Sequence, residues 1–278
     1  MDLCLVKRFD RINYDHEREE TPNIEKLMLH VHTEIEIYFL IEGNVEYHIE
    51  NSIYKPKPGD ILVMRPGEIH TSKPDCSRPY ERINLRFSPD LLKETLNARL
   101  LSPILDRPLG SANLYTAEEL PVSFIRSCFD RMLSDSSADG VRRSVAYLLP
   151  ILQEIYEVWL TREHVASNES ASVPAQIISY INQNLASLQS PKQISDAFFM
   201  SPSQIYRIFR SYTGTSVWEY VRTKRLFTAR ELLQTGFHPH AAAETSGYQD
   251  YSTFYRAYRK QFGHNPQDDY QPGLEEPG

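Results

Sequence analysis

The sequence predicts an α+β protein of two domains, with strands and then helices in the N-terminal domain and only helices in the C-terminal one. Three observations support this prediction. Residues 1–90 alternate apolar and polar side chains in short runs, as strands with one buried face do. From about Pro121 the apolar residues recur three and four positions apart, which is the period of an amphipathic helix. The C-terminal part of the chain contains one helical pattern twice.

The composition is that of an ordinary globular protein. The 278 residues are 41% hydrophobic and 24% charged, and at roughly 150 residues per domain they make about two domains. Charges run through the N-terminal segment, and no stretch approaches the roughly 18 apolar residues of a membrane span. Cys4, Cys76 and Cys128 are far apart and form no CxxC pair, which argues against a disulfide framework and a cysteine zinc site. We therefore expect a cytoplasmic protein that does not cross a membrane.

The domain boundary is predicted from composition and charge. Because HVASNESASVP is small, polar and ends in proline, we place the first domain at residues 1–163, a linker at 164–173 and the second domain at 174–278. The net charge is −7, but it is uneven: residues 174–278 hold ten Lys and Arg against nine Asp and Glu, and residues 1–173 hold twenty against twenty-eight. An acidic domain joined to a mildly basic one indicates that the two domains have different functions.

The segment HVHTEIEIYFLIEG (30–43) is predicted to be a strand with one polar and one apolar face. The same alternation in YERINLRF (80–87) predicts a second such strand. The polar faces carry His30, His32, Glu36 and Tyr38 on the first strand and Arg82 on the second. Two histidines and a glutamate on one face could hold a metal. Two polar faces could instead line a wet cavity.

An apolar stripe runs along the helix predicted for residues 145–160. It contains Leu148, Leu152, Ile155 and Trp159. One interpretation is a helix that covers the β-rich domain. The stripe is also wide enough to serve as a dimer seam, and both interpretations stay open.

The internal repeat predicts two helix-turn-helix units, at about residues 190–214 and 238–263. SPSQIYRIFRSYTG (201–214) and DYSTFYRAYRKQFG (250–263) align without a gap. Ser201 and Asp250 are in N-cap positions, and a short helix that begins after Ser190 precedes the first copy. The exposed face of the first copy is predicted to carry Ser203, Tyr206, Arg207 and Arg210, and that of the second Ser252, Thr253, Arg256 and Arg259.

These two faces predict binding to double-stranded DNA. A capped helix that presents hydroxyls and arginines fits the major groove, where arginine can bind guanine through two hydrogen bonds. The intervening segment SVWEYVRTKRLFTARELLQTG predicts a helix with Trp218, Val221, Leu226, Ala229, Leu232 and Leu233 along one buried face. Such a helix would hold both units at a fixed spacing.

The C-terminal segments resemble the double helix-turn-helix domain of AraC/XylS-type bacterial transcription regulators over about 100 residues. The resemblance implies that Ser203, Tyr206 and Arg207, and then Ser252, Thr253 and Arg256, lie where the family contacts bases. It also implies activation through contact with RNA polymerase. The second unit departs further from the family, because Pro239 stands where an aliphatic residue is usual.

The N-terminal segment resembles the cupin-type β-barrel that AraC-like regulators carry, over about residues 20–90. His30, His32, Glu36 and Gly43 match the first cupin motif, and Gly59, Gly67 and His70 keep the spacing of the second. In that fold the polar faces point into the barrel. Three imidazoles and a carboxylate would suit Fe, Mn, Zn or Ni.

Three alternatives remain for this polar cluster: a metal-dependent cupin enzyme with an appended DNA-binding domain, a sensor, and a set of histidines and glutamate that only satisfy one another. We favour the sensor, in which His30, His32, Glu36, Tyr38, His70 and Arg82 bind a small polar metabolite such as a sugar. The prediction is thus an effector-responsive activator and not an enzyme, with no catalytic residue, metal ligand or cofactor assigned. Its expected partners are double-stranded DNA, the effector, RNA polymerase and a second copy of the chain.

Overall fold

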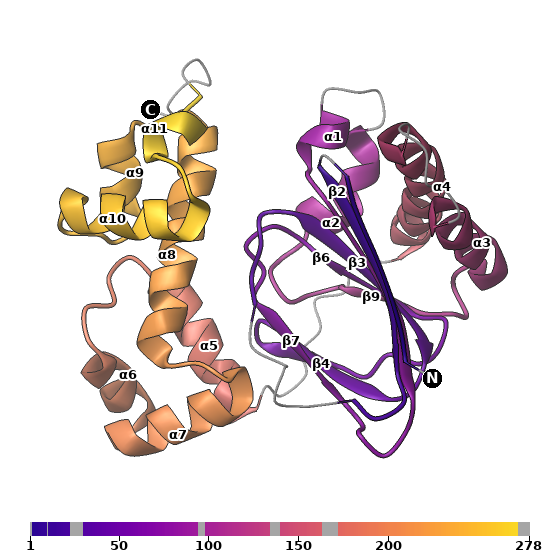
Figure 1. Cartoon of the computed structure of the whole chain (residues 1–278). Coiled ribbons are helices and arrows are strands. Elements are labelled where there is room, and N and C mark those ends of the chain that lie inside the picture. Colours follow the sequence, from indigo (N-terminus) through magenta and orange to yellow (C-terminus); the bar gives the residue numbers. More distant parts are fainter. Residues whose placement is uncertain are drawn as a thin grey trace. The chain divides into compact units, whose positions relative to one another are not determined.

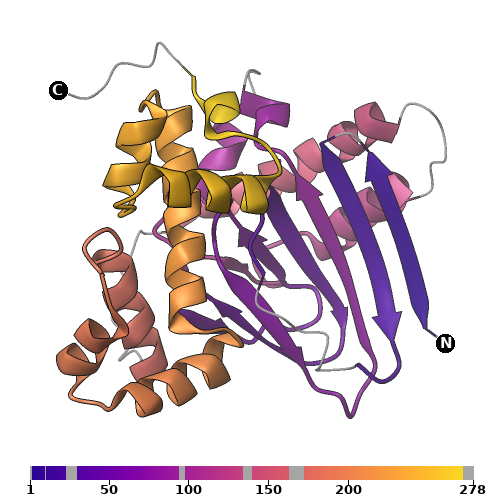
Figure 2. The same ribbon diagram turned by 60° about the vertical axis from the view of Figure 1, so that its left-hand side comes forward.

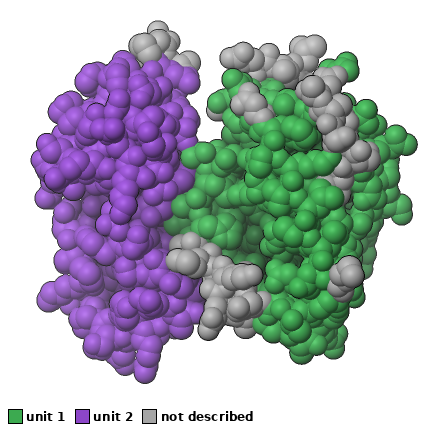
Figure 3. All heavy atoms as spheres, viewed as in Figure 1, with its two compact units in different colours: residues 1–170 green, residues 171–278 purple. Residues whose placement is uncertain are grey.

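Two units make up the chain, residues 1–170 and residues 171–278 (Figure 3). The computed structural model describes residues 2–9, 11–22, 30–93, 98–133, 140–162 and 172–271. Of the predicted linker, residues 164–171 therefore lie outside the described part. Each unit is taken by itself below.

The strands of the first unit form two antiparallel sheets that face one another (Figure 1). Among the described residues, the larger sheet has the strand order β1-β2-β8-β3-β6-β9 and the smaller one β5-β4-β7. Figure 2 shows the two N-terminal strands, in indigo, at one edge of the larger sheet. The bounds are β1 Leu3–Phe9, β2 Ile12–Glu19, β3 Ile35–Glu42, β4 Val45–Ile49, β5 Ser52–Tyr54, β6 Ile61–Met64, β7 His70–Pro74, β8 Tyr80–Phe87 and β9 Leu114–Tyr115.

The predicted alternation along the third strand is confirmed, but the strand is shorter than expected. Ile35, Ile37 and Phe39 belong to the main hydrophobic core, whereas Tyr38 and Leu40 belong to a second cluster with residues of β4, β6 and β8. The strand was predicted to begin at His30 and begins instead at Ile35. The reason is tertiary: the His30 backbone pairs with His70 in an isolated bridge.

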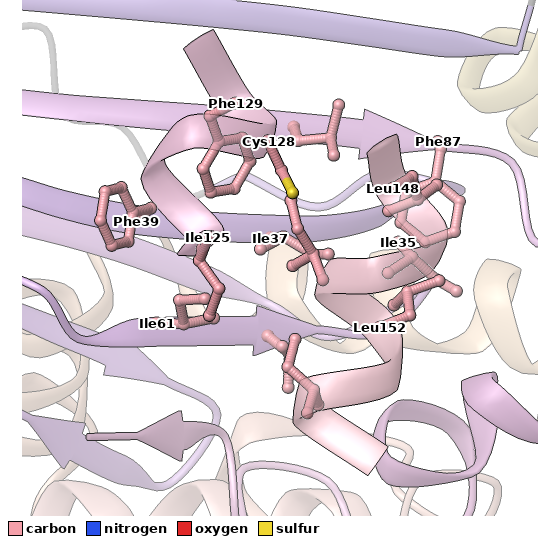
Figure 4. Packing of buried hydrophobic residues seen from close by; sticks show 14 of the residues in the cluster. Ile35, Ile37, Phe39, Ile61, Phe87, Ile125, Cys128, Phe129, Leu148 and Leu152 are labelled. Atoms are coloured by element: carbon pink, nitrogen blue, oxygen red, sulfur yellow. The ribbon is translucent and has the colours of Figure 1, made fainter. Parts of the chain in front are cut away.

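Helices cover the outer face of the larger sheet. They are α1 Asp90–Lys93, the 3-10 helix η2 Ala98–Leu101, α2 Ser102–Leu105, α3 Val122–Leu133 and α4 Gly140–Thr161. Figure 4 shows Leu148 and Leu152 of α4 beside Ile35 and Phe87 of the sheet. Burial of this apolar face against α3 and α4 removes a large area of apolar surface from water, which stabilises the unit.

The apolar stripe of α4 therefore serves the core of its own chain. Leu148, Leu152 and Ile155 are fully buried in the cluster, and Trp159 is partly buried against it. The alternative that these residues form a dimer seam is wrong for the three buried ones, because the sheet residues already cover them. The alternative that the helix covers the β-rich domain is confirmed.

The second unit is helical throughout its ordered elements: α5 Val173–Gln183, α6 Pro191–Phe198, α7 Pro202–Thr213, α8 Val217–Gln234, α9 Pro239–Thr245, α10 Tyr251–Phe262 and α11 Pro266–Asp269. In Figure 1, α8 runs between the group α5–α7 and the group α9–α11. Among the described residues, no helix is long and apolar enough to span a membrane.

The predicted helix starts are confirmed in detail. Ser190 and Ser201 each form a reciprocal capping box, and Asp250 accepts a hydrogen bond from the Thr253 backbone. The buried face of α8 contains Val221, Leu226, Ala229 and Leu233 as predicted. Trp218 was also predicted to lie on it but is 40% exposed, because it lies away from the side of the first turn that carries Val217, Tyr220 and Val221, which are buried.

Candidate DNA-reading helices and effector site

The helix α7 separates its residues as the sequence predicts. Ile205, Phe209 and Tyr212 are buried, and the opposite face is exposed. The exposed residues include Ser203, Tyr206, Arg207 and Arg210. The capped N-terminus of the helix and its cationic face are therefore both free to approach a ligand.

The helix α10 repeats this arrangement. Phe254 and Tyr258 pack with residues of α8 and α9, and the four predicted residues Ser252, Thr253, Arg256 and Arg259 are exposed. The Thr253 hydroxyl donates to Oδ1 of Asp250 over 2.6 Å, so that its proton serves the N-cap. Nε of Arg256 donates to the Ser252 carbonyl over 3.3 Å, which lays this arginine back along its own helix.

In each helix-turn-helix unit, one arginine lies over the ring of a tyrosine four residues earlier. Arg210 lies over the Tyr206 ring at 5.8 Å and Arg259 over the Tyr255 ring at 5.9 Å. The two pairs differ in the hydrogen-bond partner of the tyrosine hydroxyl. Nη1 of Arg210 donates to the Tyr206 hydroxyl over 2.7 Å, whereas the Tyr255 hydroxyl donates to Oδ1 of Asn265 over 2.7 Å. Arg210 is thus held more firmly than Arg259.

Arg225 of α8 was not predicted to matter and joins α8 to the connection between α5 and α6. Its guanidinium donates to the carbonyls of Leu185 and Leu188, in the connection between α5 and α6. Gly247, in the turn between α9 and α10, has φ of +98°, and a Cβ there would lie 2.7 Å from the Ala186 carbonyl oxygen and 2.8 Å from Nε of Arg225. The sequence did contain a signal, because Arg225 is four residues after Val221 on the buried face.

The predicted effector-site residues of the first unit divide into two neighbouring groups. The first is a cluster of three histidines around Glu36. The His30 and His70 rings are 4.3 Å apart and the His32 and His70 rings 5.0 Å apart. Nε2 of His32 donates to Oε2 of Glu36 over 2.8 Å, and Nε2 of His70 is 3.7 Å from the same oxygen. Nδ1 of His70 donates to the Glu68 carbonyl over 2.7 Å.

Burial and charge set the protonation of this cluster. Burial alone would raise the pKa of Glu36, but the adjacent imidazoles of His32 and His70 hold it well below its usual value. Burial alone would lower the pKa of His70, but the Glu36 carboxylate raises it above its usual value. Glu36 is therefore a carboxylate at neutral pH. Three of the residues, His30, Glu36 and His70, offer ligand atoms within 4.8 Å of one another and could hold a divalent transition metal.

The second group contains the other two predicted residues, Tyr38 and Arg82, which lie beside Tyr80. The Tyr38 and Tyr80 hydroxyls are 3.0 Å apart, and the Arg82 guanidinium lies over the Tyr80 ring at 5.2 Å. Nη2 of Arg82 donates to Glu17 over 2.7 Å. Burial raises the pKa of Tyr38 well above its usual value, so its hydroxyl keeps its proton.

Tyr47 of β4 connects the two groups and was missed in the sequence. Its hydroxyl donates to Oε1 of Glu36 over 3.5 Å, and its ring is 4.9 Å from that of Tyr38. The signal was the alternation Val45, Tyr47 and Ile49, which faces the cluster between the sheets. Three buried atoms in this region have no hydrogen-bond partner among the described residues: Nε2 of His70, Nη1 of Arg82 and Oδ1 of Asn84.

Two family profiles match the chain, one in each unit. The AraC-like ligand binding domain matches residues 17–149, and a helix-turn-helix domain matches residues 194–270. The chain belongs to the AraC family of transcription regulators. An AraC-family regulator of this kind binds DNA and carries a ligand-binding domain, and it is a transcription factor, not an enzyme.

Relatives of this AraC-family regulator cover different shares of its length. The Arabinose operon regulatory protein of Escherichia coli K12 is 26% identical over 230 residues, which are 79% of this chain and 74% of that protein. The transcriptional regulator LumQ of Photobacterium leiognathi is 33% identical over 91 residues, 32% of this chain and 37% of LumQ. The crystal structure of ToxT from Vibrio cholerae O395 aligns with 94% of this chain over 97% of its own length, at 11% identity and with a TM-score of 0.37.

Proposed function

We propose that this AraC-family regulator is an activator that responds to a small polar metabolite, such as a sugar, bound between the sheets of its first unit. The observation that carries the proposal is the set of buried polar atoms there without hydrogen-bond partners among the described residues. Each such group costs about 1–3 kcal/mol if it stays unpaired. A ligand that satisfies these atoms would stabilise the unit.

The chemistry of these atoms favours a hydroxyl-rich ligand. Nη1 of Arg82 can only donate, and Oδ1 of Asn84 can only accept. A sugar hydroxyl both donates and accepts, so one ligand could pair with both. The rings of Tyr38, Tyr47 and Tyr80 would pack against its C–H groups. The name of the arabinose-operon relative is consistent with this ligand class.

In the second unit we propose that α7 and α10 enter successive major grooves. Arg207 and Arg256 would bind base edges, with Ser203, Tyr206, Ser252 and Thr253 beside them, and Arg210 and Arg259 would bind phosphates. Once bound, the regulator would activate transcription through contact with RNA polymerase. It would act as a homodimer through apolar side chains that remain exposed on α3 and α4, chiefly Phe124 at 45% and Leu160 at 60% exposure.

The effector half is tested by thermal unfolding of the full-length protein against a panel of sugars and other polar metabolites. One class of sugar is expected to raise the melting temperature by mass action. Asn84→Leu and Tyr38→Phe should remove that shift, while the surface variant Lys55→Ala keeps it. A panel in which no polar metabolite shifts unfolding, while a first-row transition metal ion alone does, would contradict the metabolite proposal.

The DNA half is tested by incubating the full-length protein with fragments of its own genome and sequencing those it retains. Retained fragments are expected to share two half-sites about one helical turn apart. Transcription from such a fragment with purified RNA polymerase should rise when the regulator and its effector are added. A fall in transcription would contradict the proposed sign of regulation.

A further inference from the structure

The turn between α6 and α7 contains an aromatic residue in a backbone conformation that favours glycine. Phe199 has φ of 52° and ψ of 36°, in the left-handed region. Its backbone N–H donates to the Asp196 carbonyl, and the Met200 N–H donates to the Ser195 carbonyl. These two hydrogen bonds close the C-terminus of α6 as a Schellman motif does.

The second helix-turn-helix unit makes the same turn with glycine. There Gly247 has φ of +98°, its N–H donates to the Glu244 carbonyl, and the Tyr248 N–H donates to the Ala243 carbonyl. A side chain at Gly247 would collide with the backbone of Ala186. The two turns are therefore equivalent in backbone, but only the first has room for a side chain.

The Phe199 ring contributes little to the folded unit. It is 96% exposed, so it buries almost no apolar surface within its own chain. A non-glycine residue in the left-handed region also costs free energy, because its Cβ approaches the following carbonyl oxygen. Glycine at this position would avoid both the strain and the exposed ring.

The position of Phe199 places it beside the helix that we propose reads DNA. It precedes Ser201, the N-cap of α7, by two residues. The surface that follows is exposed at Ser201, Pro202 and Ser203. When a helix-turn-helix unit docks, the N-terminal residues of its second helix meet the base edges, so that a side chain just before that helix lies at the rim of the groove.

We propose that Phe199 is a DNA-contacting residue that packs its ring on the apolar parts of the groove rim, the deoxyribose and the thymine methyl group. The proposal rests on the proposed role of α7 as a DNA-reading helix. It implies that the first helix-turn-helix unit binds DNA more tightly than the second, because Gly247 can offer no equivalent ring. The hydroxyls and arginines that follow on α7 favour DNA over a protein partner for this surface, because they suit base edges and phosphates.

The test uses four forms of the full-length protein that separate the ring from the strain. Wild type and Phe199→Tyr keep both, Phe199→Ala keeps the strain without the ring, and Phe199→Gly removes both. Binding to the retained genomic fragments is measured by fluorescence anisotropy. We expect both ringless variants to bind about tenfold more weakly, as loss of roughly half the transfer free energy of a phenyl ring predicts. Phe199→Tyr should bind as wild type does.

Three further measurements sharpen the result. Phe199→Gly should melt at a higher temperature than wild type although it binds DNA less well, a combination that general misfolding cannot produce. The dependence of affinity on salt should be unchanged, since no phosphate contact is lost. Replacing thymidine by deoxyuridine in the fragment distinguishes a contact with the thymine methyl group from one with the deoxyribose. If the methyl group is the partner of the ring, the replacement itself weakens binding of the wild-type protein.

The outcomes distinguish this inference from the proposed role of α7. Arg207→Ala serves as the reference variant. If it weakens binding and the ringless Phe199 variants do not, the inference about Phe199 is wrong and α7 still reads DNA. If neither weakens binding, α7 is not a reading helix. If the ringless variants bind DNA normally but lose activation by RNA polymerase, the ring meets a protein and the DNA proposal is overturned.

Discussion

In the second unit, several side chains on the exposed faces of α7 and α10 are already restrained by contacts within their own helix-turn-helix unit. Arg210 is fixed by the Tyr206 hydroxyl and ring, whereas Arg256 is drawn back to the Ser252 carbonyl of its own helix. The Thr253 proton is likewise used by the N-cap Asp250. We therefore expect the exposed face of α7 to bind DNA more tightly than that of α10, although the two faces have matching sequences.

Base readout should reflect this asymmetry. Arg207→Ala is expected to weaken binding to the retained fragments by about 1–3 kcal/mol and to relax base preference at one position, as loss of a bidentate contact does. Arg256→Ala should cost less, because the carbonyl of Ser252 competes for its side chain. Arg210→Ala should weaken all DNA alike and lower the salt dependence. Titration of specific and random duplexes measures all three, and a double variant Arg207→Ala, Arg256→Ala with unchanged affinity would refute the assignment.

Glu119 of the first unit gives a prediction about acid stability. It accepts hydrogen bonds from the Arg162 guanidinium and from the Thr116 backbone and hydroxyl. Burial alone would raise its pKa, but Arg162 and Thr116 lower it from 4.5 to about 2. Because the folded value lies below the unfolded one, the stability this group contributes is complete above pH 4.5 and is lost as pH falls towards 2.

Glu119→Gln should therefore melt below wild type at pH 6, and the gap should close as the pH approaches 2. Thermal unfolding of both proteins across this range measures the gap. Glu118→Gln is the control for loss of one exposed negative charge. A gap of constant size from pH 6 to pH 2.5 would show that the carboxylate charge of Glu119 does not stabilise the fold.

Elements of the second unit are joined by one buried cation. Arg225 reaches from α8 to carbonyls of the connection between α5 and α6, and Gly247 packs its backbone on the same place. The two helix-turn-helix units are thus connected by more than the α8 helix itself. The exposed Arg222, one turn before, forms an ion pair with Glu219 on its own helix.

Arg225→Met should lower the free energy of unfolding by about 3–5 kcal/mol, because it leaves the buried Leu188 carbonyl and the partly buried Leu185 carbonyl without their donor. Arg222→Met, the matched control on the same helix, should change it by less than about 1 kcal/mol, as loss of a surface ion pair does. Urea unfolding of the full-length proteins measures both values. Equal stability of the two variants would mean that Arg225 does not stabilise the packing of α8 on the connection between α5 and α6.

At the scale of the whole molecule, two units divide sensing from DNA binding. The first unit buries the stripe of α4 against its own sheet, so any second copy must use other residues. We propose that this contact uses the apolar side chains exposed on α3 and α4, Phe124 and Leu160. An isologous contact through these helices would bring two DNA-binding units to one operator.

The full-length protein is therefore expected to be a dimer at micromolar concentration. Leu160→Asp and Phe124→Asp should shift it towards monomer, because a charge in an apolar contact costs several kcal/mol. Ile53→Asp, at an exposed position on β5, is the control that should leave the dimer intact. Light scattering at several concentrations measures the mass. A monomer at high micromolar concentration would contradict the homodimer proposal.

The sequence by itself determined those features that depend on neighbours along the chain. The alternation of β3 and β8, the caps of α6, α7 and α10, and the exposed faces of the repeated helices follow from periods of two or of three to four residues and from local hydrogen bonds. Together with the repeat, they were sufficient to predict the fold class and the family.

Only the tertiary structure decided which distant residues meet. In the first unit, the pairing of His30 with His70 shortened β3, Tyr47 connected two polar groups, and the larger sheet buried the apolar stripe of α4. In the second unit, Arg225 contacts the connection between α5 and α6. The physical reason is that a periodic pattern says which face of an element is buried but not what buries it. That choice is made by the packing of the whole unit, where segments far apart in sequence satisfy one another.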